Sequence, residues 1–316
     1  MPAPCEPQGS PREGAPIQLV SSPESSLWDL RLRLRRLFDQ ADKNPQDADH
    51  IIMKHTGLDK SALLAGGHDI TKAQLAATQL AAIEADTAAR LSGRPLQYIL
   101  GEWEFYSLPF YVGEGVLVPR PETELLVDFA LNFLQNQAEN SPPPVVYDLC
   151  SGSGCIAVAV GKNCPAARVF ALELSDEAFG YLCKNIELNG TKNVTPVKAD
   201  VLAGRALLDI PAPDLILSNP PYIPAGDMDT LMDEVTHEPD MALIGGADGL
   251  DFYRALTKLW LPLLREKPQG GRLAAFEAGL GQHEAVSALI SQAGFTAGFI
   301  RDLSGIERVI TAKQEG

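Results

Sequence analysis

A buried strand that passes through a glycine turn into a helix constrains the fold of this chain most. Residues 145–150 form an apolar run, Ser-Gly-Ser-Gly follows at 151–154, and residues 155–161 have helical character. Nucleotide sites in open α/β sheets have this order of strand, glycine turn and helix. The spacing of Asp148, Gly152 and Gly154 differs from the full dinucleotide fingerprint, so the turn alone is weakly specific.

Polar side chains end the strands that follow. Arg168–Glu173 is a second strand and ends in a carboxylate, residues 193–198 lead to Asp200, and residues 215–218 lead to Asn219. Ligands of open α/β sheets bind at the carboxyl ends of the strands. There, Glu173 can accept hydrogen bonds from ribose hydroxyls and Asp200 from an adenine amine. Each acid alone is typical of a solvated loop, but together they indicate a nucleotide site in an α/β fold.

The tetrapeptide Asn219-Pro220-Pro221-Tyr222 favours methyl transfer to a planar nitrogen. Two acceptors, the Asn219 side-chain oxygen and a backbone oxygen near Pro220, can hold both N–H bonds of such a nitrogen. Proline has no backbone N–H, so neither proline donates where acceptors are needed. Tyr222 can then lie flat against the planar group. A proline-rich turn after a strand is the purely structural alternative.

Together these motifs resemble a class I S-adenosylmethionine-dependent methyltransferase and, more narrowly, the release factor glutamine methyltransferase family. The resemblance covers roughly residues 90 to 310. Cys150 departs from it, standing where the family usually has glycine, and so does Glu173, where aspartate is frequent. Neither departure removes a needed group. The narrower resemblance is carried by residues 117–124 (Leu-Val-Pro-Arg-Pro-Glu-Thr-Glu), 218–223, 237–239, 242–243, 245–250, 277–279 and 302–305, with Gln282 and Arg308.

The resemblance implies transfer of a methyl group from S-adenosylmethionine to the side-chain amide nitrogen of the glutamine in the Gly-Gly-Gln motif of peptide chain release factors. It also implies a Rossmann-like, mostly parallel sheet with an antiparallel edge hairpin. The five histidines lack paired carboxylates at metal-ligand spacing, so we expect no metal. Asn219, Pro220, Pro221 and Tyr222 are the expected catalytic and substrate-binding residues. The expected cofactor-binding residues are Asp148, Cys150, Ser151, Gly152, Ser153, Gly154, Glu173, Asp200, Val201 and Asn219.

The length and charge of the chain limit the alternatives. Its 316 residues suggest two domains or one domain with a substantial extension, and its net charge of −15 argues against nucleic acid as the main partner. Five cysteines without zinc-ligand spacing favour a reducing cytoplasm. We expect no signal peptide and no membrane-spanning run.

A helical region precedes the expected methyltransferase domain. We expect a disordered tail at residues 1–24, a helical domain at 25–93, a hairpin linker at 94–121 and the methyltransferase domain at 122–316. The expected helices run from Ser26, from Pro45 to His55, and from Thr71 to Leu91, the last with a Thr71–Gln74 capping box and an end at Gly93. Arg31, Arg33, Arg35 and Arg36 form either a surface for an acidic partner or, as we favour, a solvated helix face. The resemblance implies that this domain docks the release factor.

Three other functions compete with this interpretation. A DNA or RNA amino-methyltransferase could use the same Asn-Pro-Pro-Tyr loop, but it would need a basic face. A non-catalytic binding protein could retain the cofactor site, although the intact loop at Asn219 argues against that. A nicotinamide-dependent oxidoreductase is disfavoured by the incomplete glycine fingerprint.

Overall fold

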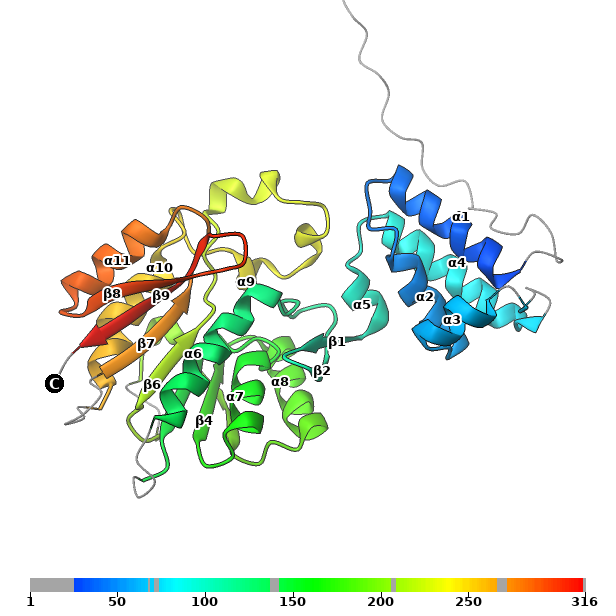
Figure 1. Ribbon diagram of the computed structural model, residues 1–316. Coiled ribbons are helices and arrows are strands. Elements are labelled where there is room, and N and C mark those ends of the chain that lie inside the picture. Colours follow the sequence, from blue (N-terminus) through cyan, green and yellow to red (C-terminus); the bar gives the residue numbers. More distant parts are fainter. Residues whose placement is uncertain are drawn as a thin grey trace, which may run out of the picture. The chain divides into compact units, whose positions relative to one another are not determined.

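The chain divides into two compact units in the computed structural model, one ending at Leu100 and the other beginning at Gly101 (Figure 1). The structure describes residues 26–67, 69–70, 74–136, 142–205, 209–265 and 272–314. The expected tail at residues 1–24 and the residue Thr71 lie outside these ranges.

The first unit is helical. Ser26 begins α1 with a capping box, in which Asp29 N donates to Ser26 Oγ (3.1 Å) and Ser26 N donates to the Asp29 carboxylate (2.9 Å). One face of α1 is buried, with Leu30, Leu34 and Phe38 in the interior. The helices are α1 (Leu27–Gln40), α2 (Asp47–Thr56), α3 (Lys60–Gly66), α4 (Ala77–Leu91) and α5 (Leu96–Leu100).

The start expected for the third long helix was wrong. Helix α4 begins at Ala77, and its capping bond runs from Ala76 N to Gln79 Oε1 (2.9 Å). Residues 74–79 are Gln-Leu-Ala-Ala-Thr-Gln, so a strong helix-forming composition continues across the true boundary and hides it. Gly93, with φ of +97°, follows the end of α4 as expected.

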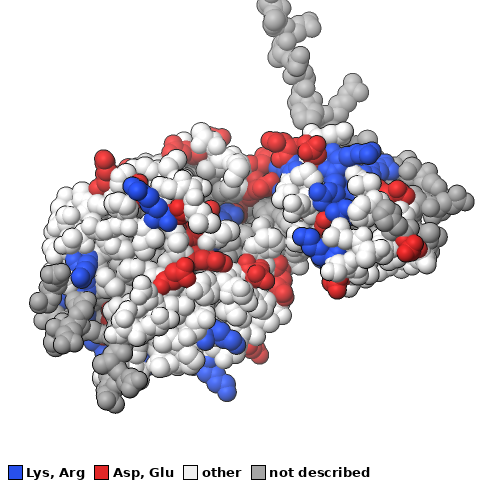
Figure 2. Space-filling model, in the orientation of Figure 1, with Lys and Arg blue, Asp and Glu red and all other residues white. Residues whose placement is uncertain are grey.

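The solvated helix face that we favoured for the arginines of α1 was wrong for Arg31. Arg31 is buried and makes two hydrogen bonds to the Asp49 carboxylate of α2 (2.7 and 2.8 Å), and Arg35 adds a third at 3.1 Å. A bidentate pair of this kind fixes the geometry between two helices. Lys and Arg also gather on the face of the helical unit that Figure 2 shows.

The second unit is built on a seven-stranded sheet of order β5-β4-β3-β6-β7-β9-β8, as expected for the α/β class. Strands β3 to β7 are parallel, and β9 and β8 form the antiparallel edge hairpin. Leu149 of β3 pairs with Leu172 of β4 and with Ser218 of β6, so these strands end side by side. The strands are β3 (Val145–Leu149), β4 (Arg168–Glu173), β5 (Val194–Lys198), β6 (Leu215–Ser218), β7 (Arg272–Glu277), β8 (Thr296–Arg301) and β9 (Glu307–Gln314).

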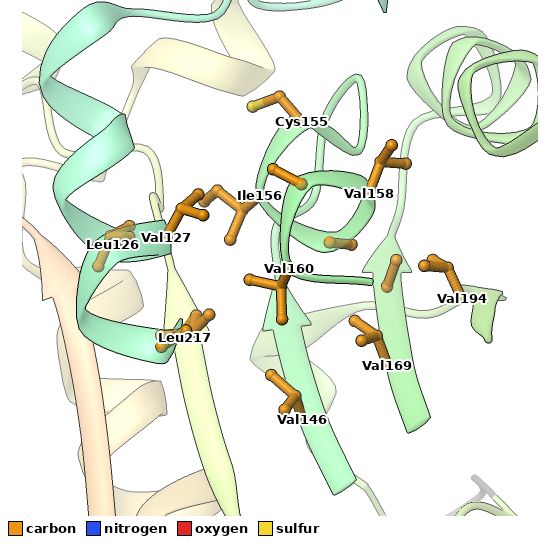
Figure 3. Close-up of a cluster of buried hydrophobic side chains, with 14 of the residues drawn as sticks. Leu126, Val127, Val146, Cys155, Ile156, Val158, Val160, Val169, Val194 and Leu217 are labelled. Carbon is orange, nitrogen blue, oxygen red and sulfur yellow. The ribbon is translucent and has the colours of Figure 1, made fainter. Parts of the chain in front are cut away.

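Two hydrophobic cores lie on opposite faces of this sheet because successive strand residues point to opposite faces. Val146 and Leu217 pack with α6 (Glu124–Gln135) and α7 (Cys155–Asn163), as Figure 3 shows. Tyr147 and Ile216 pack on the other side, with α10 (Asp251–Ala255) and α11 (His283–Gln292). The sheet is therefore covered on both faces, and its carboxyl edge is the place for a site.

The sequence predicts a helix near Leu250 to Leu264, but this segment does not form one regular α-helix. After α10 the chain makes a π-helical turn, η6 (Leu256–Trp260), and then a 3-10 turn, η7 (Leu261–Leu263). Pro262 has no backbone N–H to donate within a helix, so the regular helix does not continue through it.

Shorter elements complete the second unit. The expected hairpin consists of β1 (Glu102–Phe105) and β2 (Leu108–Tyr111). Helix α8 (Asp176–Asn189) follows β4, and α9 (Asp240–Leu243) lies between β6 and α10. The 3-10 turns are η2 (Pro121–Thr123), η3 (Val201–Ala203), η4 (Ala225–Thr230) and η5 (Val235–His237). Among the helices described here, none has the length and apolar character to cross a membrane.

Candidate active site

A cavity of about 310 Å³ opens at the carboxyl edge of the sheet. The loops that follow β3, β4, β5 and β6 all contribute to its lining. Asp148, Gly154, Pro220 and Tyr222 are not part of the lining. The expected site residues that line the cavity are Cys150, Ser151, Gly152, Ser153, Glu173, Asp200, Val201, Asn219 and Pro221.

Glu173 holds the glycine turn in place. Its Oε2 accepts a hydrogen bond from Gly152 N (2.8 Å), and its Oε1 accepts one from Ser175 N (2.7 Å). A carboxylate offers about four lone-pair positions, so each oxygen can accept a further hydrogen bond. Glu173 can therefore contact a ligand in the cavity and shape the glycine turn at the same time.

The glycine turn needs its glycines for different reasons. Gly154 has φ of +80°, and a Cβ there would collide with Leu182 of α8. A Cβ on Gly152, with φ of +54°, would meet nothing within 4 Å. Gly154 thus permits helix packing, whereas Gly152 leaves open space beside the cavity. Cys150 also has a positive φ, of +62°, a conformation that usually favours glycine.

Asp148 lies beneath the turn with no exposed surface. Its Oδ2 accepts a hydrogen bond from Ala157 N (3.1 Å), which ties β3 to the first turn of α7. Its Oδ1 is buried and has no hydrogen-bond partner within the part of the chain that the structure describes. Burial raises the pKa of Asp148 to about 7.

Asp200 and Val201 form the wall that follows β5. Asp200 Oδ1 accepts from Leu202 N (2.8 Å) and so begins η3. Val201 is buried, and its carbonyl accepts a hydrogen bond from the Trp260 indole (2.8 Å). This wall therefore presents one carboxylate beside an apolar surface, a combination that suits an aromatic ring with a polar edge.

Asn219 is oriented by a chain of hydrogen bonds that sequence analysis missed. Its Nδ2 donates to Thr123 Oγ1 (3.2 Å), and the Thr123 hydroxyl donates to Glu277 Oε2 at the end of β7 (2.6 Å). Burial raises the pKa of Glu277 to about 7. Thr123 and Glu277 both lie in segments that carried the family resemblance, which was the only signal for them.

The Pro-Pro-Tyr segment, residues 220–222, is held in place by the loops that contain Gln282 and Gly245. Gln282 Nε2 donates to the Tyr222 carbonyl (2.9 Å), and Gly279 N donates to Gln282 Oε1 (3.0 Å). Gly245 lies against the segment as well, because a Cβ there would stand 2.6 Å from the Pro221 carbonyl oxygen. Pro220 and Pro221 are buried and Tyr222 is half-buried. Burial raises the pKa of Tyr222 to about 12, so its hydroxyl stays protonated.

Arg120 is a further lining residue that sequence analysis did not assign. Its guanidinium pairs with the buried Glu238 carboxylate, which also accepts from Val118 N (3.0 Å). Burial raises the pKa of Glu238, and the neighbouring Arg120 opposes that shift. The pair joins the segment before α6 to the loop after β6.

The site lacks the features of a cysteine nucleophile or a metal centre. Burial raises the pKa of the Cys150 thiol well above its usual range, which keeps it protonated and unreactive. Within the described ranges, no group of three or more His, Cys, Asp or Glu side chains could hold a metal ion.

Comparison with known proteins gives consistent matches across both units. A family model described as the PrmC N-terminal domain matches residues 29–101, and one described as the TRM5/TYW2 methyltransferase domain matches residues 135–220. The chain is 36% identical over 288 residues to the release factor glutamine methyltransferase of Thermodesulfovibrio yellowstonii, covering 88% of this chain and 95% of that protein. The proteins of the same name from Geobacter sulfurreducens (41% identity, 73% of this chain and 78% of that protein) and Bradyrhizobium diazoefficiens (33%, 92% and 94%) are also similar.

Solved structures are similar in fold only. The hMettl16 catalytic domain in complex with MAT2A 3′UTR hairpin 6 has a TM-score of 0.52 at 16% identity, covering 72% of this chain and 81% of that chain. The same domain with hairpin 1 has a TM-score of 0.51 at 13% identity, covering 90% of each chain.

Proposed function

Because the chain belongs to the release factor glutamine methyltransferase family and is a methyltransferase, we propose that it methylates the glutamine of the Gly-Gly-Gln motif of peptide chain release factors, with S-adenosylmethionine as methyl donor. The product carries the methyl group on the side-chain amide nitrogen. The observation that carries the proposal is the shared cavity, in which Asn219 lies with the strand-end carboxylates Glu173 and Asp200.

The residues of the cavity suit the proposed cofactor. Glu173 accepts from the ribose hydroxyls, Asp200 accepts from the adenine amine, and Val201 lies against the adenine ring. The open space beside Gly152 lets the backbone approach the ligand closely. A volume of about 310 Å³ is within the range of small-molecule sites. The cofactor supplies a sulfonium methyl group as the electrophile.

The Asn-Pro-Pro-Tyr loop positions the amide nitrogen of the substrate. Because Asn219 Nδ2 is committed to Thr123, its Oδ1 is the end available to accept one N–H of the glutamine amide. A backbone carbonyl near Pro220 accepts the second N–H. With both N–H bonds held, the nitrogen lone pair is directed toward the methyl group, and alignment of this kind lowers the barrier. The amide nitrogen forms its bond to the methyl group as the methyl–sulfur bond breaks and the electron pair stays with sulfur. The positively charged nitrogen then releases one proton to water.

The helical unit provides the docking surface for the release factor in this proposal. Its helices contribute none of the strand-end groups of the cavity, and the model described as the PrmC N-terminal domain covers most of it. A protein substrate needs contacts beyond one glutamine to be recognised.

The proposal is tested by incubating the purified enzyme with radiolabelled S-adenosylmethionine and, in separate reactions, with purified release factors, ribosomal RNA and duplex DNA. We expect label in release factor alone. Label in RNA or DNA, with none in any release factor, would replace the proposal by the amino-methyltransferase alternative.

A further inference from the structure

We propose that Glu277 is a positioning residue that acts through Thr123 to fix which end of the Asn219 amide faces the cavity. The inference rests on the proposed function, in which Asn219 Oδ1 accepts an N–H of the substrate. Glu277 itself does not line the cavity.

An asparagine amide can present either end to the cavity. One end carries an oxygen that accepts, and the other carries an NH₂ group that donates. If Nδ2 faced the cavity, it would oppose a substrate N–H donor with another donor. Productive binding therefore requires a partner that selects one of the two orientations.

The hydrogen bonds at Thr123 make this selection. A threonine hydroxyl has one proton to donate and two lone pairs to accept with. The ionised Glu277 carboxylate can only accept, so the Thr123 proton is directed to Glu277 Oε2 (2.6 Å). Toward Asn219, Thr123 Oγ1 can then only accept. Asn219 therefore points its Nδ2 at Thr123 Oγ1 (3.2 Å), and its Oδ1 points away from Thr123.

The surroundings of Glu277 make the selection sensitive to protonation. Glu277 as a whole residue is 2% exposed, and its backbone carbonyl accepts a hydrogen bond from the Tyr253 hydroxyl (2.7 Å). Burial is the largest influence and raises the pKa of Glu277 to about 7. The hydrogen bond from Thr123 and the charges of Arg308 and Arg120 lower this pKa, and the charge of Glu122 raises it. The other titratable groups that face it are Tyr222, Tyr253 and Cys155.

Protonation of Glu277 removes the constraint that fixes the orientation of the Asn219 amide. A protonated carboxyl can donate to Thr123 Oγ1, which frees the Thr123 proton to turn toward Asn219 Oδ1. The Asn219 orientation is therefore fixed above a pH of about 7 and is lost as the pH falls below it.

The first test is a double-mutant cycle on turnover of a purified release factor. Thr123→Val keeps the side-chain shape without the hydroxyl, and we expect kcat to fall by roughly 10–100-fold while the cofactor Kd from calorimetry stays unchanged. Thr123→Ser restores the hydroxyl and should recover most of the turnover. In an Asn219→Ala background, Thr123→Val should cause no further loss, because both changes remove the same interaction.

Thr257→Val is the matched control. Thr257 is a comparably buried residue, 5% exposed against 2% for Thr123, and its hydroxyl donates to the backbone carbonyls of Tyr253 (2.8 Å) and Arg254 (3.2 Å) in α10. We expect it to leave kcat unaffected. Wild-type turnover in Thr123→Val, or an equal loss from that change in both backgrounds, would overturn the inference.

The second test needs no substrate. The side-chain NH₂ resonances of Asn219, assigned by their absence in Asn219→Ala, should shift with a midpoint near pH 7 in the wild type, and Glu277→Gln should abolish the shift. Resonances that do not respond to pH in the wild type would overturn the inference. If they titrate as expected but no release factor is methylated, the proposed function fails while the positioning role stands.

Discussion

At the residue scale, single carboxylates serve both the fold and the proposed chemistry. Glu173 bonds to Gly152 N and Ser175 N, and Asp200 begins η3. Sequence alone could identify both acids because each follows an apolar strand, and strand ends of a parallel sheet share one edge. It could not reveal the bond between Thr123 and Glu277, which are separated by 154 residues. Only the packing of η2 beside the end of β7 brings them together.

Glu173→Ala removes both the proposed ribose acceptor and the anchor of the glycine turn. Because hydrogen bonds to a charged group contribute roughly 1.5–3 kcal/mol, we expect affinity for S-adenosylmethionine to fall by on the order of 10–100-fold. Titration calorimetry measures the change. Glu177→Ala, which removes another lining carboxylate of the cavity, is the comparison, and an equal loss there would mean that only the net charge matters.

The buried carboxyls predict how stability depends on pH. Asp148 and Glu277 both have pKa values raised to about 7 by burial, whereas an unfolded carboxyl has a pKa of about 4. As the pH rises, the unfolded chain releases these protons at a lower pH than the folded chain does. The contribution of the two carboxyls to the free energy of unfolding is therefore full below a pH of about 4 and is lost as the pH rises through about 7. Glu277→Gln should flatten this decline in the free energy of unfolding, measured by urea titrations across that range. The exposed Glu102→Gln should not, and an equal flattening in both would contradict the assignment.

At the element scale, strands β3 to β6 and helix α7 were predicted because each is a short apolar run that ends at polar or turn residues. Helix α8 was not predicted, although it is 14 residues long. Helices α3 and α5 were missed, since seven and five residues give too few turns for a period to emerge. The interruption after α10 was also missed, although Pro262 was visible in the sequence. A proline predicts the end of a regular helix, but the π-helical turn before it depends on tertiary packing.

Two glycine substitutions separate helix packing from ligand access at the β3–α7 turn. Gly154→Ala forces a positive φ and a collision with Leu182 of α8, so we expect a loss of about 2–4 kcal/mol in the free energy of unfolding. Gly152→Ala meets nothing within 4 Å and should lose only about 1–2 kcal/mol. Urea denaturation compares the two variants. Equal losses would mean that the contact between α7 and α8 is looser than the structure has it.

At the scale of the whole molecule, the two units have separate tasks in our account. The helical unit is internally braced by the buried pairs Arg31–Asp49 and Arg90–Asp47 (2.7 and 2.6 Å), and the cavity is lined only by residues of the second unit. Composition predicted the helical region and its order in the chain. Helical periodicity does not reveal which surface docks a partner, because a face that packs in the core and a face that docks a partner can both be apolar.

A chain that begins at Gly101 tests this separation of tasks. We expect it to bind S-adenosylmethionine with affinity close to that of the full chain, since all lining residues remain. Methylation of an intact release factor should fall sharply, because the docking surface is gone, whereas a short Gly-Gly-Gln peptide should be affected much less. Circular dichroism and calorimetry first establish that the shortened chain is folded and binds cofactor. Equal losses on both substrates would assign the helices to folding instead of recognition.

The position of the transferred methyl group tests the proposed glutamine methylation. A purified release factor is incubated with S-adenosylmethionine and either wild-type enzyme or Asn219→Ala, digested, and sequenced by tandem mass spectrometry. We predict one added methyl group on the glutamine of the Gly-Gly-Gln motif with the wild type. With folded Asn219→Ala that product should form about 10²–10³-fold more slowly. A methyl group on any other residue, or undiminished methylation by folded Asn219→Ala, would contradict the account.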